Sequence, residues 1–382
     1  MNPRNTLFSL LGALALLGCK SSSSEELTRS RQILTASVGL EHGLVLVEKT
    51  FGRAIYINVE DSDVAPRSMT IAKSPVLAVP RSGDHHEALI LSTGEAGDQD
   101  TEESPAGLAA VNDEGVRAQI NLGSNPFNWI NQSDDGKYAL LTRTDSGGRL
   151  LQNASEYAVV DLDHPSDSAL IATGTLPARP YDSAFSKGFS IAGKPRRLLS
   201  VLVPGAVAIL DLEHPDRKPA VIDLGGSSEG TLIPAEAEFE SVSDRLYLRA
   251  IGSNDLYVVN FAPREASAGE NDFELSVNLV AVGASPKDFA TFGTNERSDV
   301  AVLSASRVFV LRQGEAQPTS TYVSKNWSRL TLVGERGSGT GTHLGFLWSP
   351  DDEDAGLIDL DKVGGDESPV IYLRLARPAS AV

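Results

Sequence analysis

Cysteine is almost absent from this chain, because Cys19 is the only one among 382 residues. An intrachain disulfide is therefore excluded, and the fold must be held together by packing. The sequence also lacks a Cys-x-x-Cys pair, a Gly-rich phosphate loop, a His-Glu-x-x-His helix motif and a Gly-x-Ser-x-Gly nucleophile turn. These absences remove the usual signatures of thiol redox proteins, nucleotide hydrolases, zinc proteases and esterases.

Basic residues are also in deficit, with 33 Lys and Arg against 51 Asp and Glu, for a formal net charge of −18. A field of this sign repels nucleic acids and anionic lipid headgroups, and it favours solubility and basic partners. We therefore expect no nucleic-acid partner.

Long hydrophobic runs are missing except for one near the amino terminus, from Leu7 to Leu17. The run is about half as long as the roughly 20 residues that a membrane-spanning helix needs. It follows the positively charged Arg4, which is typical of a signal peptide. Residues 1–18 are accordingly predicted to be a signal peptide and are excluded from the fold.

The run ends in Leu16-Leu17-Gly18-Cys19, which resembles the lipobox of bacterial lipoproteins. The resemblance implies cleavage before Cys19, a diacylglyceryl group on its thiol and an acyl group on its new amino terminus. Three acyl chains suffice for stable anchoring, so the membrane is an expected partner that the chain does not span. Lys20 is not the aspartate that retains such proteins at the inner membrane, so the resemblance favours the outer membrane of the cell envelope. Residues 19–32 would then form the lipidated cysteine and a flexible tether.

From Ile33 onward, short apolar strands alternate with turn residues, and no helical period is visible. A polar residue closes the third strand of each four-strand unit, at Asn58, Asn112, Asp161, Asp211, Asn260, Arg312 and Asp359. The interval is about 50 residues, which suits one blade of a β-propeller. The sequence thus predicts an all-β fold over residues 33–376, a seven-bladed β-propeller of four-stranded antiparallel blades, with a tail at 377–382.

The third and fourth units carry the most regular copies, Val160-Asp161-Leu162 and Leu210-Asp211-Leu212, and an Asp135-Gly136 turn leads into an aromatic strand. These phrases resemble the YVTN or lactonase-like seven-bladed propellers, whereas the Gly-His and Trp-Asp signature of WD40 blades is absent. The family includes lactonases, surface proteins and scaffolds, so the resemblance implies a fold without a function. Two closures of the repeat stay open: residues 33–38 form the first strand of blade one, or they pair beside residues 370–375.

Histidines offer two candidate metal positions. His164-Pro165 and His214-Pro215 occupy equivalent points on neighbouring blades, where side chains diverge, and we interpret them as turn residues. His85-His86-Glu87 lies at a strand, whose successive side chains point to opposite faces. No metal site is predicted at either position.

Two acidic loops join second and third strands and are predicted to form a docking surface for a partner: Glu95, Asp98, Asp100, Glu102 and Glu103 in blade two, and Asp351, Asp352, Glu353 and Asp354 in blade seven. Clustered carboxylates also suit Ca²⁺, but the spacing of a dedicated calcium loop is missing, so no cofactor is assigned. The opposite face is expected to be locally basic, through Lys187, Lys194, Arg196 and Arg197 of blade four.

These features favour a membrane-anchored propeller that binds another envelope protein or an extracellular ligand, with no catalytic residues assigned. The alternative is a lactonase-like hydrolase with a metal-dependent site at the propeller channel. Its candidate residues lie on the predicted inner strands, at Asp182, Asp288, and Glu236 or Glu238.

Overall fold

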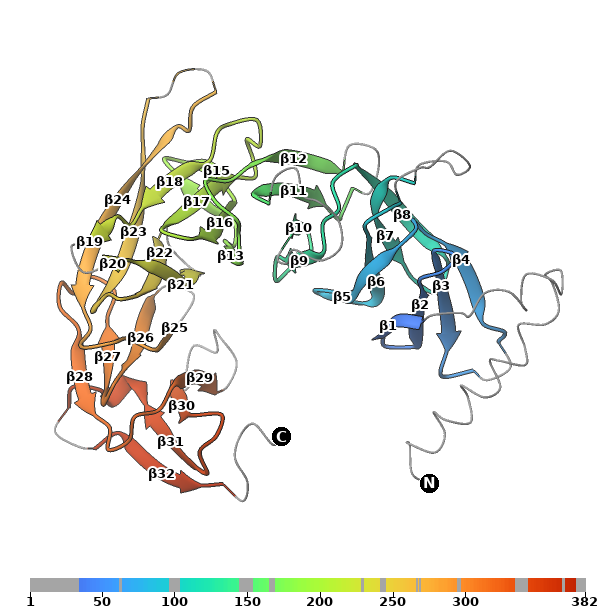
Figure 1. Ribbon diagram of the computed structural model, residues 1–382. Coiled ribbons are helices and arrows are strands. Elements are labelled where there is room, and N and C mark those ends of the chain that lie inside the picture. Colours follow the sequence, from blue (N-terminus) through green and yellow to red (C-terminus); the bar gives the residue numbers. More distant parts are fainter. Residues whose placement is uncertain are drawn as a thin grey trace. The chain divides into compact units, whose positions relative to one another are not determined.

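The computed structural model describes residues 34–61, 64–95, 104–143, 154–164, 169–227, 230–240, 245–265, 267, 269–293, 297–333, 343–365 and 368–375. Within these ranges the regular structure is extended strand, apart from the short 3-10 helix η2 (Leu360–Lys362) (Figure 1). No helix in the described part of the chain is long and apolar enough to cross a membrane. The predicted signal peptide, the tether and most of the predicted tail lie outside the described residues.

Within the described residues, seven antiparallel sheets of four strands follow one another along the sequence, and we number them as blades one to seven. The first three blades consist of β1 (Leu34–Gly39), β2 (Gly43–Glu48), β3 (Arg53–Asn58) and β4 (Arg67–Thr70); β5 (Pro75–Arg81), β6 (Asp84–Ser92), β7 (Ala106–Val111) and β8 (Val116–Gly123); and β9 (Trp129–Gln132), β10 (Tyr138–Thr142), β11 (Glu156–Asp161) and β12 (Leu170–Thr175).

The remaining four blades consist of β13 (Asp182–Phe185), β16 (Leu198–Val203), β17 (Ala206–Asp211) and β18 (Ala220–Asp223); β21 (Ile233–Phe239), β22 (Arg245–Ile251), β23 (Asp255–Pro263) and β24 (Phe273–Ala281); β25 (Asp288–Gly293), β26 (Ser298–Ser304), β27 (Arg307–Leu311) and β28 (Thr319–Tyr322); and β29 (Arg329–Val333), β30 (Leu344–Trp348), β31 (Asp354–Asp359) and β32 (Val370–Arg374). Two small hairpins are added, β14 (Phe189–Ile191) with β15 (Lys194–Arg196), and β19 (Gly226–Ser227) with β20 (Gly230–Thr231).

The predicted fold class, with seven blades of four antiparallel strands, is confirmed by this strand order. The first of the two closures is also confirmed, because β1 pairs with β2 and β32 pairs with β31, so each blade comes from one continuous segment. The blades group into two compact units, with blades one and two in the first and blades three to seven in the second.

The predicted closing residue of the third strand forms a turn in five blades, whereas in blade five the prediction is wrong, because Asn260 lies inside β23; the five turn-forming residues are Asn58, Asn112, Asp161, Asp211 and Asp359. The Asn58 side chain accepts hydrogen bonds from the backbone N–H groups of Glu60 and Asp61, at 2.8 and 2.9 Å. Asp161 accepts in the same way from Asp163 and His164. Such Asx turns reverse the chain toward the fourth strand. The repeated phrase therefore marks an exit turn, as the sequence predicts.

The core lies between neighbouring blades within each unit. The middle strands β16, β17 and β26 are buried along their whole length, because a blade covers each of their two faces. Outer strands such as β32 are mostly exposed after their first residue. This arrangement explains why the second and third strands of a blade read as continuous apolar runs, without the alternation of a half-exposed sheet.

Candidate functional site

The loop of blade four that was expected to be basic folds into the β14–β15 hairpin. Its turn residues Ala192 and Gly193 have φ values of 50° and 78°, the left-handed pair that a tight two-residue hairpin turn requires. Phe189 of this hairpin packs against Phe261 of blade five, with ring centroids 6.1 Å apart. The hairpin therefore brings its basic residues against the neighbouring blade.

Arg196 is the centre of an ion-pair network at this junction, and only 4% of its side chain is exposed. One of its guanidinium nitrogens donates to both carboxylate oxygens of Asp272, each at 2.6 Å. Lys194 and Arg217 contact the same carboxylate at 3.0 and 2.7 Å. Burial alone would raise the pKa of Asp272, but the hydrogen bonds from these three cations hold it well below its usual range.

The predicted basic face is corrected in one respect, because Lys194 and Arg196 do not project freely but share the Asp272 carboxylate with Arg217. The neighbouring Arg197 lies between β15 and β16 and pairs with Asp135 of blade three at 2.7 Å. Asp272 follows Arg196 by 76 residues, so nothing local in the sequence reveals the pairing. Lys187 is separate from this network and lines a smaller cavity of 260 Å³.

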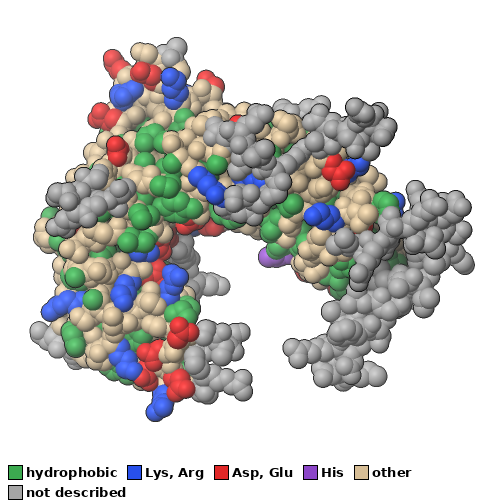
Figure 2. Space-filling model, in the orientation of Figure 1, with side chains coloured by type: hydrophobic (Ala, Val, Ile, Leu, Met, Phe, Trp, Pro, Cys, Tyr) green, Lys and Arg blue, Asp and Glu red, His purple; other side chains and the backbone are tan. Residues whose placement is uncertain are grey.

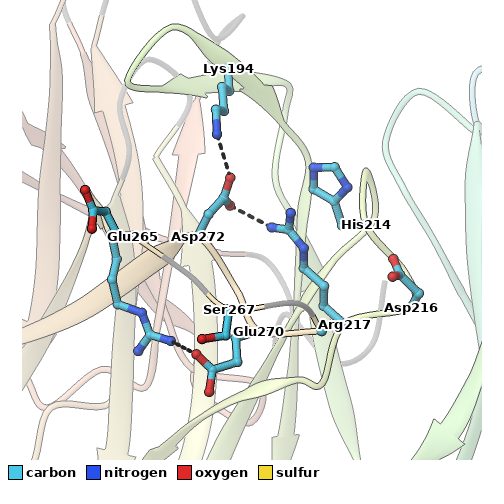
Figure 3. A pocket seen from close by; sticks show the side chains of 10 residues that line it. Lys194, His214, Asp216, Arg217, Glu265, Ser267, Glu270 and Asp272 are labelled. Atoms are coloured by element: carbon cyan, nitrogen blue, oxygen red, sulfur yellow. Dashed lines mark hydrogen bonds and ion pairs between the residues drawn. The ribbon is translucent and has the colours of Figure 1, made fainter.

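A polar cavity of 710 Å³ opens beside the network (Figure 3). Its walls come from the β14–β15 hairpin, the β17–β18 turn and the long β23–β24 hairpin, and they consist of Lys194, His214, Asp216, Arg217, Arg264, Glu265, Ser267, Gly269, Glu270 and Asp272. All three segments belong to the same unit, and Figure 2 shows acidic and basic side chains interspersed around the end that carries the β23–β24 hairpin.

The charged residues that line the cavity divide into ion-paired residues and two further acidic residues, Asp216 and Glu265, which we call the rim carboxylates. Asp272 occupies three cations, and Arg264 pairs with Glu270 at 3.1 Å. Among the residues that the structure describes, no ion pair engages Asp216 or Glu265, and both line the cavity (Figure 3). A charged, apolar-poor wall of this kind suits a polar polypeptide segment better than an apolar small molecule.

The two acidic loops predicted for docking have different outcomes. Residues 96–103 of the blade-two loop lie outside the described residues, and Glu95 is the last described residue before them. In blade seven, Asp354 pairs with Lys325 and Glu353 lies 3.5 Å from Arg374. The Asp352 carboxylate accepts the backbone N–H of Asp354 at 2.9 Å. Three of these four acidic side chains thus take part in contacts within blade seven or with the segment that leads into it.

Two of the inner-strand carboxylates proposed for a hydrolase accept hydrogen bonds from the next blade. Glu238 of blade five accepts the hydroxyl of Thr291 in blade six at 2.7 Å. Asp288 of blade six accepts the backbone N–H of Leu330 in blade seven at 2.8 Å. Asp182 accepts the N–H of the adjacent Ser183 at 2.8 Å, and burial raises its pKa.

Glu236 and Asp288 nevertheless form a pair that the sequence could not reveal. A register shift between Pro234 and Glu236 marks a bulge in β21, a feature that re-aims side chains. Burial, and next the charge of Asp288, raise the pKa of Glu236 to about 8, although Arg249 contacts it at 3.1 Å and lowers it. Burial and the neighbouring charge therefore favour the protonated form of Glu236.

Glu236→Gln is expected to change how stability depends on pH. Because the folded pKa of Glu236 is raised, its protonated form stabilises the fold at about pH 5, and this contribution is lost as pH rises toward 8. The free energy of unfolding can change by at most about 1.4 kcal/mol per pH unit when one proton is released. Since 30% of the side chain is exposed, we expect the wild type to lose on the order of 2 kcal/mol relative to the variant. Urea unfolding at about pH 5 and about pH 8 measures this; equal losses in both proteins would contradict it.

The histidines that the sequence singled out lie in separate places. His164 Nδ1 lies 3.0 Å from the Asp161 carboxylate in its exit turn, and His214 lines the cavity between blades four and five. Glu87, next to His85 and His86, is buried and pairs with Arg81 at 3.1 Å and with Arg117. Glu87 therefore belongs to the structure of blade two, while His86 turns toward blade one.

No protein-family model matches this chain, and no curated protein matches its sequence. Similar solved structures include the dihydro-haem d1 dehydrogenase NirN in complex with DHE, with 12% identity and a TM-score of 0.42 over 87% of this chain and 63% of that one. Apo AztD from Citrobacter koseri is 11% identical, with a TM-score of 0.44 over 90% of this chain and 87% of AztD.

Sqt1 from Chaetomium thermophilum, bound to the N-terminus of the ribosomal protein L10, is 12% identical with a TM-score of 0.47, over 80% of this chain and 76% of Sqt1. This chain therefore spans less than two thirds of NirN. Likeness at this level gives no argument about ligands or activity, and the fold rests on the strand order itself.

Proposed function

We propose that this protein is a lipid-anchored lipoprotein of the cell envelope whose propeller serves as a docking scaffold for a basic polypeptide segment. The observation that carries the proposal is the cavity between blades four and five, with Asp216 and Glu265 on its rim. Loops on a rigid scaffold are the usual place for binding residues in such folds. The partner would be another envelope protein or an extracellular polypeptide.

The charge of the chain supports a basic partner. Its net charge of −18 attracts positively charged segments over a long range. The rim carboxylates would pair with the cationic side chains of such a segment. Anchoring is supported by the Leu16-Leu17-Gly18-Cys19 phrase, and the outer membrane by Lys20. The resemblance to YVTN propellers agrees with a surface or envelope location and adds no reaction.

Photocrosslinking in cells tests the docking surface. A photoreactive amino acid at Asp216 or Glu265 is expected to give discrete crosslinked products, because both residues line the cavity. The same group at Tyr322, which is 62% exposed on β28, serves as the control for random encounter. Identical products at all three positions, or products at Tyr322 alone, would contradict the proposed surface.

A further inference from the structure

Two histidines from successive blades of the first unit meet at its surface. His42 ends the turn between β1 and β2, and His86 is the third residue of β6. Their ring centroids lie 5.0 Å apart, with the ring planes inclined by 26°. The Glu41 N–H donates to the His85 carbonyl at 2.9 Å, so the turn of blade one is fastened to the strand that carries His86. This backbone hydrogen bond therefore holds His42 and His86 close together.

A carboxylate completes the group. The ligand atoms of Glu41, His42 and His86 all lie within 4.8 Å of one another, and Glu41 Oε2 is 3.4 Å from His86 Nε2. Ligands of one zinc ion lie about 4 Å apart or less, because each bond is about 2.0–2.2 Å long. Roughly half of each side chain is exposed: 53% of Glu41, 45% of His42 and 56% of His86. Small side-chain rotations can therefore bring the three ligand atoms within zinc-binding distance of one another.

A second carboxylate supports His42 from the other side. His42 Nδ1 lies 2.8 Å from Glu60 Oε1, and Glu60 is held by the Asx turn of Asn58. A carboxylate bonded to one ring nitrogen fixes the tautomer that offers a lone pair at the other, which is the usual support of a metal-binding histidine. The hydrogen bond to Glu60 raises the pKa of His42, burial lowers it, and the charges of Glu60, Glu41 and Asp113 raise it further. These carboxylates create a field that attracts cations.

We propose that Glu41, His42 and His86 form a binding site for a divalent first-row transition ion, with Zn²⁺ as the best fit. Two imidazoles and one carboxylate suit zinc and its neighbours, whereas Ca²⁺ needs six to eight oxygen ligands. Three protein ligands leave a coordination position open, and their exposure makes the ion exchangeable. The ion would link the β1–β2 turn of blade one to strand β6 of blade two, within the first unit.

Zinc titration of the full mature chain by isothermal calorimetry tests the site, with Co²⁺ absorption as a second readout of the ligand set. We expect one saturable ion per chain, bound at least about tenfold more weakly by His42→Ala and by His86→Ala, with Glu60→Gln also weakened by about tenfold. Circular dichroism confirms that each variant is folded.

Two matched controls keep the test specific. His85→Ala removes the adjacent imidazole but keeps the carbonyl that binds the Glu41 N–H, and His164→Ala removes an exposed histidine 3.0 Å from a carboxylate in blade three. Both are expected to bind zinc like the wild type. The proposal is overturned if no saturable binding occurs, if His42→Ala and His86→Ala keep full affinity, or if either control loses affinity as much as they do.

Discussion

Asp272→Asn is expected to lower the free energy of unfolding of the second unit by about 3 kcal/mol, because it leaves a buried guanidinium without its main counterion. Arg196 is 4% exposed, and its next acidic neighbour, Asp211, is 3.6 Å away rather than 2.6 Å. Asparagine keeps the shape of aspartate, so the loss reports charge and hydrogen bonding. Chemical denaturation at neutral pH measures the effect.

The pH dependence of this difference has a defined sign. Since the folded pKa of Asp272 is depressed, its contribution is fully present above the unfolded value of about 3.9 and is lost as pH falls through the folded pKa. The gap between wild type and Asp272→Asn should therefore persist from neutral pH to about pH 4 and shrink below it. A gap that is already closed at pH 5 would contradict the network.

Two controls separate the buried network from surface charge. Asp216→Asn, on the cavity rim, should cost no more than about 0.5 kcal/mol, because surface substitutions usually do not. Adding Arg196→Met to Asp272→Asn should restore part of the stability, since the uncompensated charge is then replaced by an apolar side chain of similar length. If the double variant is less stable than Asp272→Asn alone, the assignment of Arg196 as the stranded charge is wrong.

Cys19→Ser is expected to abolish acylation and to release the protein from the membrane. The thiol is the group to which the proposed diacylglyceryl chain is attached, and serine cannot form the thioether. Each acyl CH₂ contributes about 0.8 kcal/mol of membrane affinity, so losing the chains removes the anchor. Metabolic labelling with an alkyne fatty acid and phase partitioning in detergent measure both effects. Fatty-acid labelling that persists in the variant would contradict the proposed anchor.

Lys20→Asp provides a matched control for the anchor, because it leaves Cys19 intact. Labelling should be unchanged, while fractionation should shift the protein from the outer to the inner membrane. Unchanged fractionation would remove the sorting role of Lys20 without affecting the anchor itself.

The blade count could be predicted from the sequence because five of the seven repeats end the third strand with a turn-forming Asn or Asp. Asn58, Asp161 and Asp359 each cap the backbone two residues ahead, so local chemistry fixes the spacing. Pro75 likewise opens a first strand, as expected of a residue that cannot donate to the ladder inside a sheet.

The sites depend on contacts between blades, which the sequence does not reveal. Arg196 meets Asp272 across 76 residues, and His86 meets His42 from the preceding blade. The positions of His85 and His86 on one strand predict that their side chains diverge, but they do not predict that Glu41 and His42 of the β1–β2 turn approach His86. The sequence predicts Glu236 and Asp288 as inner-strand carboxylates. It does not predict the electrostatic interaction between them, or the bulge in β21 beside Glu236.

The docking surface is tested most directly by the amount of crosslinked partner recovered from solubilised envelopes. This amount is compared between the wild type and the Asp216→Lys/Glu265→Lys variant. The matched control is Glu114→Lys/Glu315→Lys, which makes the same charge change on exposed turns between third and fourth strands elsewhere. We predict that the rim variant recovers about tenfold less partner than the wild type, and that the control recovers the wild-type amount. Equal recovery by both variants would contradict a docking surface at this cavity.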